Sequence, residues 1–247
     1  MWLVLAGLDD LSALWAFQGL KAHGLLPIEF ITAEMLAYSL RWNYRLGKQG
    51  SSTEIALADG RTIKTENIRG VLNRLTSFPS DHLQIAQPVD REYAVQEFMA
   101  FAIGWLYALP QPVLNQPTPQ GLSGRWRHAS EWAWLAMRAG LPVLPYQQGS
   151  REQPSTVSAP FGLSNAPTAS VIVVGGQVLG EALPIHVVEG CRQLACLAET
   201  SLLGIEFVPS AGLPWAFAQA TPLPDLRIGG SALLDVLVLL LRQEVAK

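Results

Sequence analysis

Asn73 and Arg74 combine two side chains that could bind a ligand with a position that favours binding. They end the apolar segment Gly70–Arg74, which the sequence predicts to be a buried strand with a polar carboxyl end. Clefts of open α/β sheets lie at the carboxyl ends of strands, and an amide beside a guanidinium can hold a carboxylate by two hydrogen bonds. We therefore take Asn73 and Arg74 as candidate ligand-binding residues. The alternative is that Arg74 pairs with a nearby carboxylate of the chain itself.

Other catalytic chemistry finds little support in the residue pattern. The four histidines are not spaced as metal-ligand pairs with one another, and no G-x-S-x-G nucleophile motif occurs. The two cysteines, Cys191 and Cys196, lack the further Cys or His residues of a zinc set, so we expect free, buried thiols. The sequence therefore predicts no metal site.

Composition restricts the partners that this chain can have. Hydrophobic residues make up 49% and charged residues 15% of the chain, and the net charge is −3. No basic run occurs, so we expect neither nucleic acid nor membrane as a partner. The apolar segments 98–109 and 232–241 are too short to span a bilayer, and segment 1–8 lacks a basic leader, so we expect a cytoplasmic protein. A surface so poor in charge favours burial against a second copy or a protein partner.

The first predicted elements form a βαβ unit. Trp2–Ala6 is an apolar strand, Asp9 or Asp10 can cap a helix that Gly24 ends, and Ile28–Thr32 is the next strand. The turn between the first strand and the helix has one glycine and two carboxylates, which would repel a pyrophosphate. The dinucleotide fingerprint is therefore absent.

Further elements follow from hydrophobic period and turn residues. We expect an antiparallel pair in 38–57, a strand at 62–64, helices at 90–109 and 123–139, a strand at 113–115, a hairpin at 171–183, a helix at 187–199, a second hairpin at 201–222 and a helix after 229–230. Segment 147–168 is expected to be a linker or mobile loop. The helix at 123–139 carries Trp126, Trp132 and Trp134, which suit a core or, as the rival interpretation, a partner surface.

Several of these segments, in their order, resemble the ATP-grasp ligases that act on peptide and ribosomal-protein carboxylates. The segments are VLNRL at 71–75 with the helix after it, VLNQP at 113–117, GLPVLPY at 140–146, VIVVGGQVLGEAL at 171–183 and SLLGIEFVPSAGLPWAFAQATPLP at 201–224. The resemblance implies the α/β fold class, with a pre-ATP-grasp-like α/β domain at 1–115. A truncated, ATP-grasp-like α+β domain would follow at 116–247.

The same resemblance implies where catalytic groups have been lost. Glu206 stands at the Asp of the family's G-x-D-F motif, Gln219 at its metal-binding Glu and Thr221 at its metal-binding Asn. A neutral amide cannot supply the carboxylate charge that Mg²⁺ favours, and a hydroxyl is a poorer ligand than an amide carbonyl. The family's DxR motif would precede Val171, where this chain has APTAS. These positions are therefore interpreted as degenerate metal positions.

The resemblance also implies that a lobe is missing. Between GLPVLP and VIVVGG the family has a β-rich lobe that clamps ATP, whereas about two dozen residues intervene here, too few for four strands and their turns. No lysine occurs between Lys64 and Lys247. The arginines that could substitute for the lost cations are Arg125, Arg127, Arg138, Arg151, Arg192 and Arg227.

From these departures we expect a catalytically inactive ATP-grasp-like protein that needs no cofactor. It would act as a binding or accessory subunit in peptide or natural-product modification, as a homodimer or with a protein partner, and with a peptide as candidate ligand. Two alternatives stay open. One is an active ATP-dependent carboxylate–amine ligase with an arginine-based site, and the other is a small-molecule binding protein that uses the cleft between the two halves.

Overall fold

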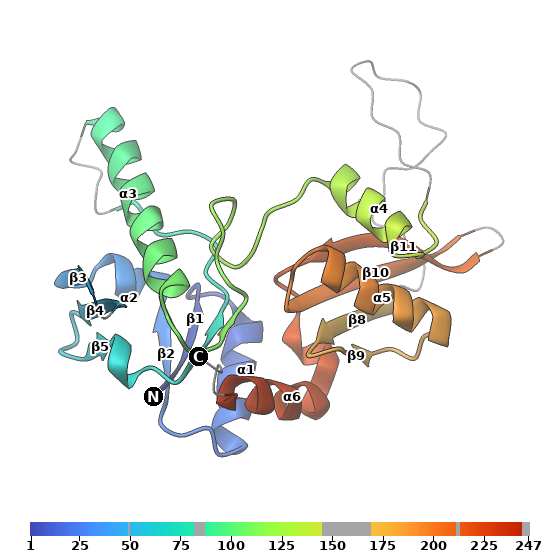
Figure 1. The fold of residues 1–247 in the computed structure, drawn as a ribbon, viewed down its shortest axis with the longest axis horizontal. Helices are drawn as coiled ribbons and strands as arrows, with labels where there is room; N and C mark the ends of the chain where they lie inside the picture. Colours follow the sequence, from blue (N-terminus) through green and yellow to red (C-terminus); the bar gives the residue numbers. More distant parts are fainter. Residues whose placement is uncertain (49, 82–86, 145–168, 211–212, 244–247) are drawn as a thin grey trace. The chain divides into compact units, whose positions relative to one another are not determined.

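The computed structural model describes residues 1–247 apart from 49, 82–86, 145–168, 211–212 and 244–247 (Figure 1). The chain divides into two compact units, and the first is discontinuous in sequence. Unit 1 comprises Met1–Trp126 together with Asp225–Lys247, and unit 2 comprises Arg127–Pro224.

Both units combine helices with short strands. Unit 1 contains β1 (Trp2–Ala6), α1 (Leu11–Ala22), β2 (Ile28–Thr32), α2 (Ala33–Ala37), β3 (Arg41–Gly47), β4 (Gly50–Ala56), β5 (Thr62–Lys64), η1 (Thr65–Asn67), β6 (Gly70–Asn73), α3 (Pro88–Tyr107), β7 (Val113–Leu114), η3 (Leu226–Gly229) and α6 (Gly230–Arg242). Unit 2 contains α4 (Ala129–Arg138), β8 (Ala169–Val174), β9 (Gln177–Gly180), α5 (Ile185–Leu197), β10 (Leu202–Ser210) and β11 (Leu213–Thr221). The predicted α/β fold class is confirmed.

A four-stranded parallel sheet in the order β2-β1-β6-β7 forms the centre of unit 1. All five residues of β1 and all four of β6 are buried, as expected for parallel strands covered on both faces. β1 lies between β2 and β6, so the strand order changes direction at β1. The carboxyl ends of β1 and β6 therefore form a topological switch point.

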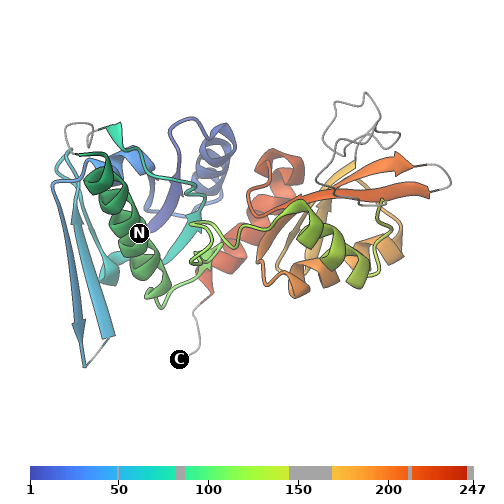
Figure 2. The ribbon, with the colours of Figure 1, turned by 90° about the horizontal axis from the view of Figure 1, so that it is seen from above.

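A second sheet of unit 1, in the antiparallel order β3-β4-β5, packs one face on α3. The indole of Trp42 meets the rings of Phe98, Phe101 and Trp105 edge-on, with centroid distances of 5.0, 4.9 and 5.6 Å. Figure 2 shows the β3–β4 hairpin beside α3. Such edge-to-face pairs stabilise beyond the area that they bury. These contacts hold the apolar face of the hairpin against α3, and the alternate residues of β3, which are polar, lie on its other face.

Unit 2 is an antiparallel sheet in the order β11-β10-β8-β9 with both of its helices on one face. Val171, Leu203, Ile205 and Phe207 point from the strands into the core, where α4 and α5 pack. Successive strand residues point to opposite faces, so Glu206 lies on the face away from this core.

The division into units differs from the predicted domains 1–115 and 116–247 at both ends of unit 2. The first boundary lies after Trp126, because Ser123 donates a hydrogen bond to the Leu75 carbonyl (2.7 Å) within unit 1. The second difference is α6, which packs on unit 1. Trp2 Nε1 donates to the Leu241 carbonyl (3.3 Å), and a side chain at Gly70 would meet that oxygen at 2.8 Å. A non-local contact therefore decides the domain of α6.

The predictions for the start of α4 and for Cys196 need correction, and the predicted loop lies outside the residues that the structure describes. The helix expected from 123 begins at Ala129, because Gly124 has φ +111° and His128 forms the N-cap. Cys191 is buried, as predicted, and burial raises the pKa of its thiol to about 12, but Cys196 is exposed because the offset of five residues turns it to another face of α5. The predicted loop 147–168 lies outside the described residues. Among the described helices, none is both long and apolar enough to cross a membrane.

Candidate functional site

Asn73 lies at the end of β6, where its buried side chain joins separate segments of unit 1. Its Nδ2 donates to the carbonyls of Asn115 (2.9 Å) and Leu122 (2.7 Å), and its Oδ1 accepts from the backbone N–H of Leu75 (3.3 Å). The residue is 1% exposed. Because both amide hydrogens already bind backbone carbonyls, a ligand at this side chain would have to displace bonds that hold β6 to the segment after β7.

Arg74 forms a buried ion pair with Asp10. Its Nε lies 2.7 Å from Asp10 Oδ2 and its Nη2 3.4 Å from Oδ1, and the two side chains are 6% and 19% exposed. Asp10 Oδ1 also accepts from the Ala13 backbone N–H (2.8 Å) and so caps α1. One carboxylate thus joins the end of β6 to the start of α1. This pairing is the alternative that the sequence left open for Arg74.

The ion pair spans the switch point of the parallel sheet. Arg74 directly follows β6 and Asp10 lies in the turn after β1, so the two residues come from neighbouring strand ends. Open α/β sheets bind ligands at this place. A ligand carboxylate that reached Arg74 here would compete with Asp10 for its guanidinium. The role of Asn73 and Arg74 in ligand binding stays a prediction.

The three residues that the resemblance interprets as degenerate metal positions lie close together in unit 2. Glu206 pairs with Gln219 across β10 and β11, and Thr221 pairs with Gly204 two residues along. Gln219 Nε2 donates to Glu206 Oε2 (2.6 Å), and Thr221 Oγ1 accepts from the backbone N–H of Leu223 (3.1 Å). All three side chains are half-buried. The structure therefore brings together the residues that the motif order singled out.

This cluster does not fit a magnesium–phosphate site. Mg²⁺ is held by carboxylate oxygens together with water and phosphate oxygens, and it demands nearly ideal octahedral geometry. Glu206 is the one carboxylate of the three, and the amide of Gln219 directs a hydrogen-bond donor at it. Within the described ranges, no three His, Cys, Asp or Glu side chains are grouped so that they could hold a metal ion.

The arginines considered as substitutes are largely engaged in their own units. Arg151 lies outside the described residues. Three of the others form ion pairs: Arg127 with Glu131 (3.1 Å), Arg192 with Glu189 (3.1 Å) and Arg227 with Asp225 (2.6 Å). Arg127 also donates a hydrogen bond to the Ala198 carbonyl (2.8 Å), and the Arg138 guanidinium lies over the Trp134 ring, 4.8 Å from its centroid. Each of these contacts would have to be given up, in whole or in part, before the side chain could bind phosphate.

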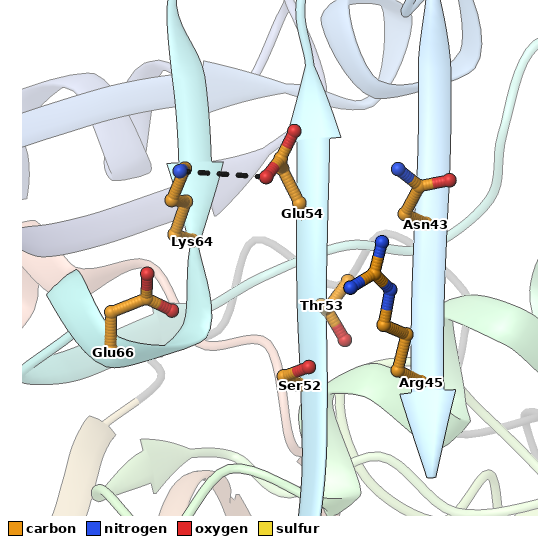
Figure 3. Close-up of a pocket in the computed structure, with 7 residues that line it drawn as sticks. All are labelled: Asn43, Arg45, Ser52, Thr53, Glu54, Lys64 and Glu66. Atoms are coloured by element: carbon orange, nitrogen blue, oxygen red, sulfur yellow. Dashed lines mark ion pairs between the residues drawn. The ribbon is translucent and has the colours of Figure 1, made fainter.

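A polar hollow of about 140 Å³ lies on the three-stranded sheet of unit 1 (Figure 3) and contains none of the residues predicted as a site. Its lining residues are Asn43, Arg45, Ser52, Thr53, Glu54, Lys64 and Glu66. Glu54 binds Lys64 (3.5 Å) and Arg41 (3.0 Å), and these cations, Lys64 foremost, lower the pKa of the Glu54 carboxyl. The signal in the sequence was the period-two alternation of polar residues in β3, which marks one polar face of a strand.

Comparison by sequence gives no assignment. No protein-family model matches this chain, and no curated protein sequence matches it.

Comparison by structure gives whole-chain matches to a macrocyclase and to ATP-grasp ligases. The macrocyclase MdnC from Microcystis aeruginosa MRC, bound with precursor peptide MdnA, has a TM-score of 0.71 at 11% identity and covers 96% of this chain and 99% of its own. The ATP-grasp ligase PsnB, complexed with minimal precursor, Mg and ADP, has a TM-score of 0.65 at 17% identity, with 98% of both chains covered. A Chryseobacterium gregarium RiPP-associated ATP-grasp ligase, in complex with ADP and a leader and core peptide, has a TM-score of 0.63 at 11% identity, with 99% of both covered. Such identities establish the fold, and the predicted resemblance is confirmed at that level: the chain has the fold of the ATP-grasp ligases.

Proposed function

We propose that this chain is a catalytically inactive protein of ATP-grasp fold that acts as a binding or accessory subunit in peptide or natural-product modification. Peptide is the favoured ligand class because MdnC and the Chryseobacterium ligase, which share the fold over the whole chain, are both described with bound peptides. A protein that keeps the scaffold without the phosphate chemistry can still hold such a ligand.

The hydrogen bond from Gln219 to Glu206 is the observation that carries the proposal. In the resemblance these two positions hold carboxylates that bind magnesium. Here the amide of Gln219 supplies the neighbouring carboxylate with a donor, so the pair satisfies itself without a cation. Phosphoryl transfer depends on metal ions that neutralise the charge of the phosphates and hold the phosphates in position. A pair whose carboxylate accepts a hydrogen bond from its neighbour does not supply the ligands that such an ion needs.

The length of the chain between the two halves of unit 2 supports the loss of the ATP-clamping lobe. About two dozen residues separate Leu144 from Ala169, the first residue of β8. Strands of about five residues with their turns would need more chain than this to build a four-stranded lobe. The proposed protein therefore lacks the means to cover a nucleotide and exclude water from it.

Exposed aromatic and sulfur side chains on α4 support a protein partner or a homodimer. Trp134 and Met137 are 51% and 60% exposed and lie one turn apart on the helix, and Trp126, just before it in unit 1, is 67% exposed. Aromatic residues and methionine are enriched in interface cores. Trp132 is buried, so both interpretations of the tryptophan-rich segment apply, each to different residues.

The decisive experiment measures thermal unfolding and phosphate release with millimolar Mg·ATP, alone and with a peptide ligand. We expect neither a shift of the unfolding transition nor release of phosphate. An active ligase saturated at 100 times its Kd would gain about 2.7 kcal/mol of stability. A nucleotide-dependent shift accompanied by turnover would overturn the inactive assignment. Sedimentation then tests the partner: a 26.8 kDa monomer that co-purifies with nothing would favour the small-molecule alternative.

A further inference from the structure

β3 is an outer strand whose second edge pairs with no other described strand. It pairs with β4 from Arg41 to Gly47 and ends the sheet order β3-β4-β5. An edge strand presents a row of backbone N–H and C=O groups that can template a further strand. At seven residues, β3 is long enough for an extended segment to pair with it.

The apolar face of β3 carries half-buried aromatic side chains that contact α3. The ring centroid of Tyr44 lies 5.7 Å from that of Phe101, and Trp42 contacts the same ring at 4.9 Å. All three residues keep part of their surface exposed. Apolar side chains of an added strand would therefore find aromatic neighbours at the positions next to β3.

The opposite face of β3 is cationic and incompletely neutralised. Arg41 is paired with Glu54, whereas Arg45 forms no ion pair with any described residue. Figure 3 shows Arg45 on the β3 side of the hollow, while the Lys64–Glu54 pair spans β4 and β5. A carboxylate placed beside β3 could therefore bind the Arg45 guanidinium by a charge-assisted hydrogen bond without breaking an ion pair to any residue that the structure describes.

The local charge of this hairpin is opposite in sign to that of the whole chain. The hairpin, residues 41–56, contains the three cations Arg41, Arg45 and Lys48 and one acidic residue, Glu54, whereas the net charge of the chain is −3. Cations on an edge strand are a usual protection against pairing with another copy. They protect against a like-charged strand and, for the same reason, attract an acidic one.

We propose that the open edge of β3 binds an extended peptide in which acidic and apolar side chains alternate. The peptide adds as a strand beside β3, with its acidic face over Arg45 and Asn43 and its apolar face beside Trp42, Tyr44 and Phe101. Backbone hydrogen bonds supply affinity in this mode, and the alternating side chains supply specificity. The inference deepens the proposed function and rests on it only in taking a peptide as the ligand.

A second copy of the chain fits this edge less well than an acidic peptide. Antiparallel pairing of two β3 strands about Tyr44 would match Tyr44 with itself and Asn43 with Arg45, which is favourable. It would also gather Arg41, Arg45 and Lys48 from both copies at one junction. Like charges across neighbouring strands are destabilising, whereas each of these cations would favour an acidic peptide.

The test uses fluorescence anisotropy with the intact chain and a labelled nine-residue peptide that alternates Glu with Val. The comparison peptides have Lys in place of Glu, or the same composition with the Glu and Val residues in separate blocks. We expect the alternating Glu peptide to bind at least about tenfold more tightly than either. Arg45→Glu should weaken it at least about tenfold, a loss of about 1.4 kcal/mol. Lys21→Glu, an equal charge change on an exposed residue of α1, should stay within about twofold.

Backbone pairing is tested on the peptide, so the protein needs no change. N-methyl groups at alternate residues block one edge of a strand. Methylation of the residues whose N–H groups face β3 should abolish binding, whereas methylation of the alternate residues, whose N–H groups face away from β3, should leave binding intact. Equal binding of both methylated peptides, or of the Lys and Glu peptides, would overturn strand addition at β3. Equal binding of the Glu peptide to wild type and to Arg45→Glu would also overturn strand addition at β3. The proposal that the chain binds a peptide would still hold in that case.

Occupation by a second copy has its own signature. When Asn43→Cys and Arg45→Cys chains are mixed in a Cys196→Ser background, self-pairing about Tyr44 would place the two new thiols opposite each other within disulfide range. We expect no cross-link above that of either variant alone. An efficient mixed disulfide would assign the edge to a homodimer and refute the peptide proposal. The Mg·ATP measurement is unaffected by any of these outcomes.

Discussion

The Arg74–Asp10 pair in unit 1 and the Gln219–Glu206 pair in unit 2 are both side-chain contacts at positions where ligands would be expected. The first is a full ion pair, nearly buried, whose carboxylate also caps α1. The second joins a neutral donor to a carboxylate on half-buried strand positions. In unit 1, charge at the expected site is kept and used by the fold. In unit 2, the expected site has one carboxylate, Glu206, and the neutral amide of Gln219 donates a hydrogen bond to it.

This difference makes the two pairs unequal in their effect on stability. Removal of one partner of a buried ion pair leaves an uncompensated charge in the protein, which costs about 3–5 kcal/mol. A hydrogen bond between half-exposed side chains is replaced in part by water and contributes about 1 kcal/mol. Mutation of each pair can therefore show whether their contributions to stability differ as expected.

The largest effect is expected for Arg74→Ala. The variant leaves the Asp10 carboxylate without its cation, and we expect a loss of about 3 kcal/mol, at the low end of the range because Asp10 is 19% exposed. Urea unfolding measures it. Arg227→Ala, which breaks an exposed pair with Asp225, is the control and should cost less than about 1 kcal/mol. If Arg74→Ala unfolds like wild type, the pair is not structural and the ligand-binding interpretation of Arg74 gains.

Asn73→Ala should follow, with a loss of about 2 kcal/mol. The change deprives two backbone carbonyls, those of Asn115 and Leu122, of their buried donor and opens space at a site that is 1% exposed. The same urea measurement applies. The control is Asn43→Ala, which removes the same side chain from a less buried position on the polar face of β3. Its free energy of unfolding should change by less than about 0.5 kcal/mol. A larger change would mean that the loss at Asn73 does not arise from its buried hydrogen bonds.

The double variant Gln219→Glu with Thr221→Asn tests the interpretation of these residues as degenerate metal positions. Two carboxylates would then face each other across β10 and β11, and we expect a loss of up to about 1 kcal/mol at neutral pH, with no gain of phosphate release. The reason for the missing turnover is that phosphates must be positioned as well as neutralised. Recovery of the lost stability on addition of Mg²⁺, with turnover of ATP, would show that the metal site is latent and the lobe is not missing.

The smallest effect concerns an exposed pair in unit 1. The hydrogen bond from Arg227 holds the pKa of Asp225 below its usual 3.8. A lowered pKa means that the contribution is present above the unfolded value and is lost as the pH falls through the folded value, so it changes only below about pH 4. It is worth a few tenths of a kcal/mol. Arg227→Ala should raise the pKa of Asp225 in a carboxyl NMR titration, while Asp59, held low by Arg61, should titrate as before.

The sequence predicted most elements because their signals are local. The strands β1, β2 and β6, the two hairpins of unit 2, and α5 and α6 lie within a few residues of their expected positions. The predicted start of α4 was wrong because Gly124 has a positive φ and His128, not a residue near 123, forms the N-cap, while Ser123 hydrogen-bonds within unit 1. The predicted domain 116–247 included α6, which the structure places in unit 1 through contacts distant in sequence. An amphipathic pattern shows that a helix has a buried face but does not show which element covers it.

The site could be predicted in part for the same reason. The predicted hairpin at 201–222 put Glu206, Gln219 and Thr221 on two paired strands, whereas their cross-strand register depends on two irregularities between Glu206 and Ser210 that the sequence did not show. The partner of Arg74 could not be named, because Asp10 lies 64 residues away along the chain. The topology offered a clue: both residues follow strands that the βαβ pattern makes neighbours. Arg45 and the polar face of β3 gave a period-two signal that was read only as structure.

The return of α6 to unit 1 has a consequence for the order in which the protein can fold during synthesis. Gly19 of α1 lies so close to Leu234 of α6 that a Cβ atom there would overlap the leucine side chain. This helix leaves the ribosome only after unit 2, roughly 100 residues later than the rest of unit 1, a delay of about 5–20 s at ordinary elongation rates. Unit 2 can thus fold as an uninterrupted insert while the first 126 residues still lack their covering helix. A nascent chain halted near residue 224 would display the uncovered apolar surface of α1 and β1 to chaperones.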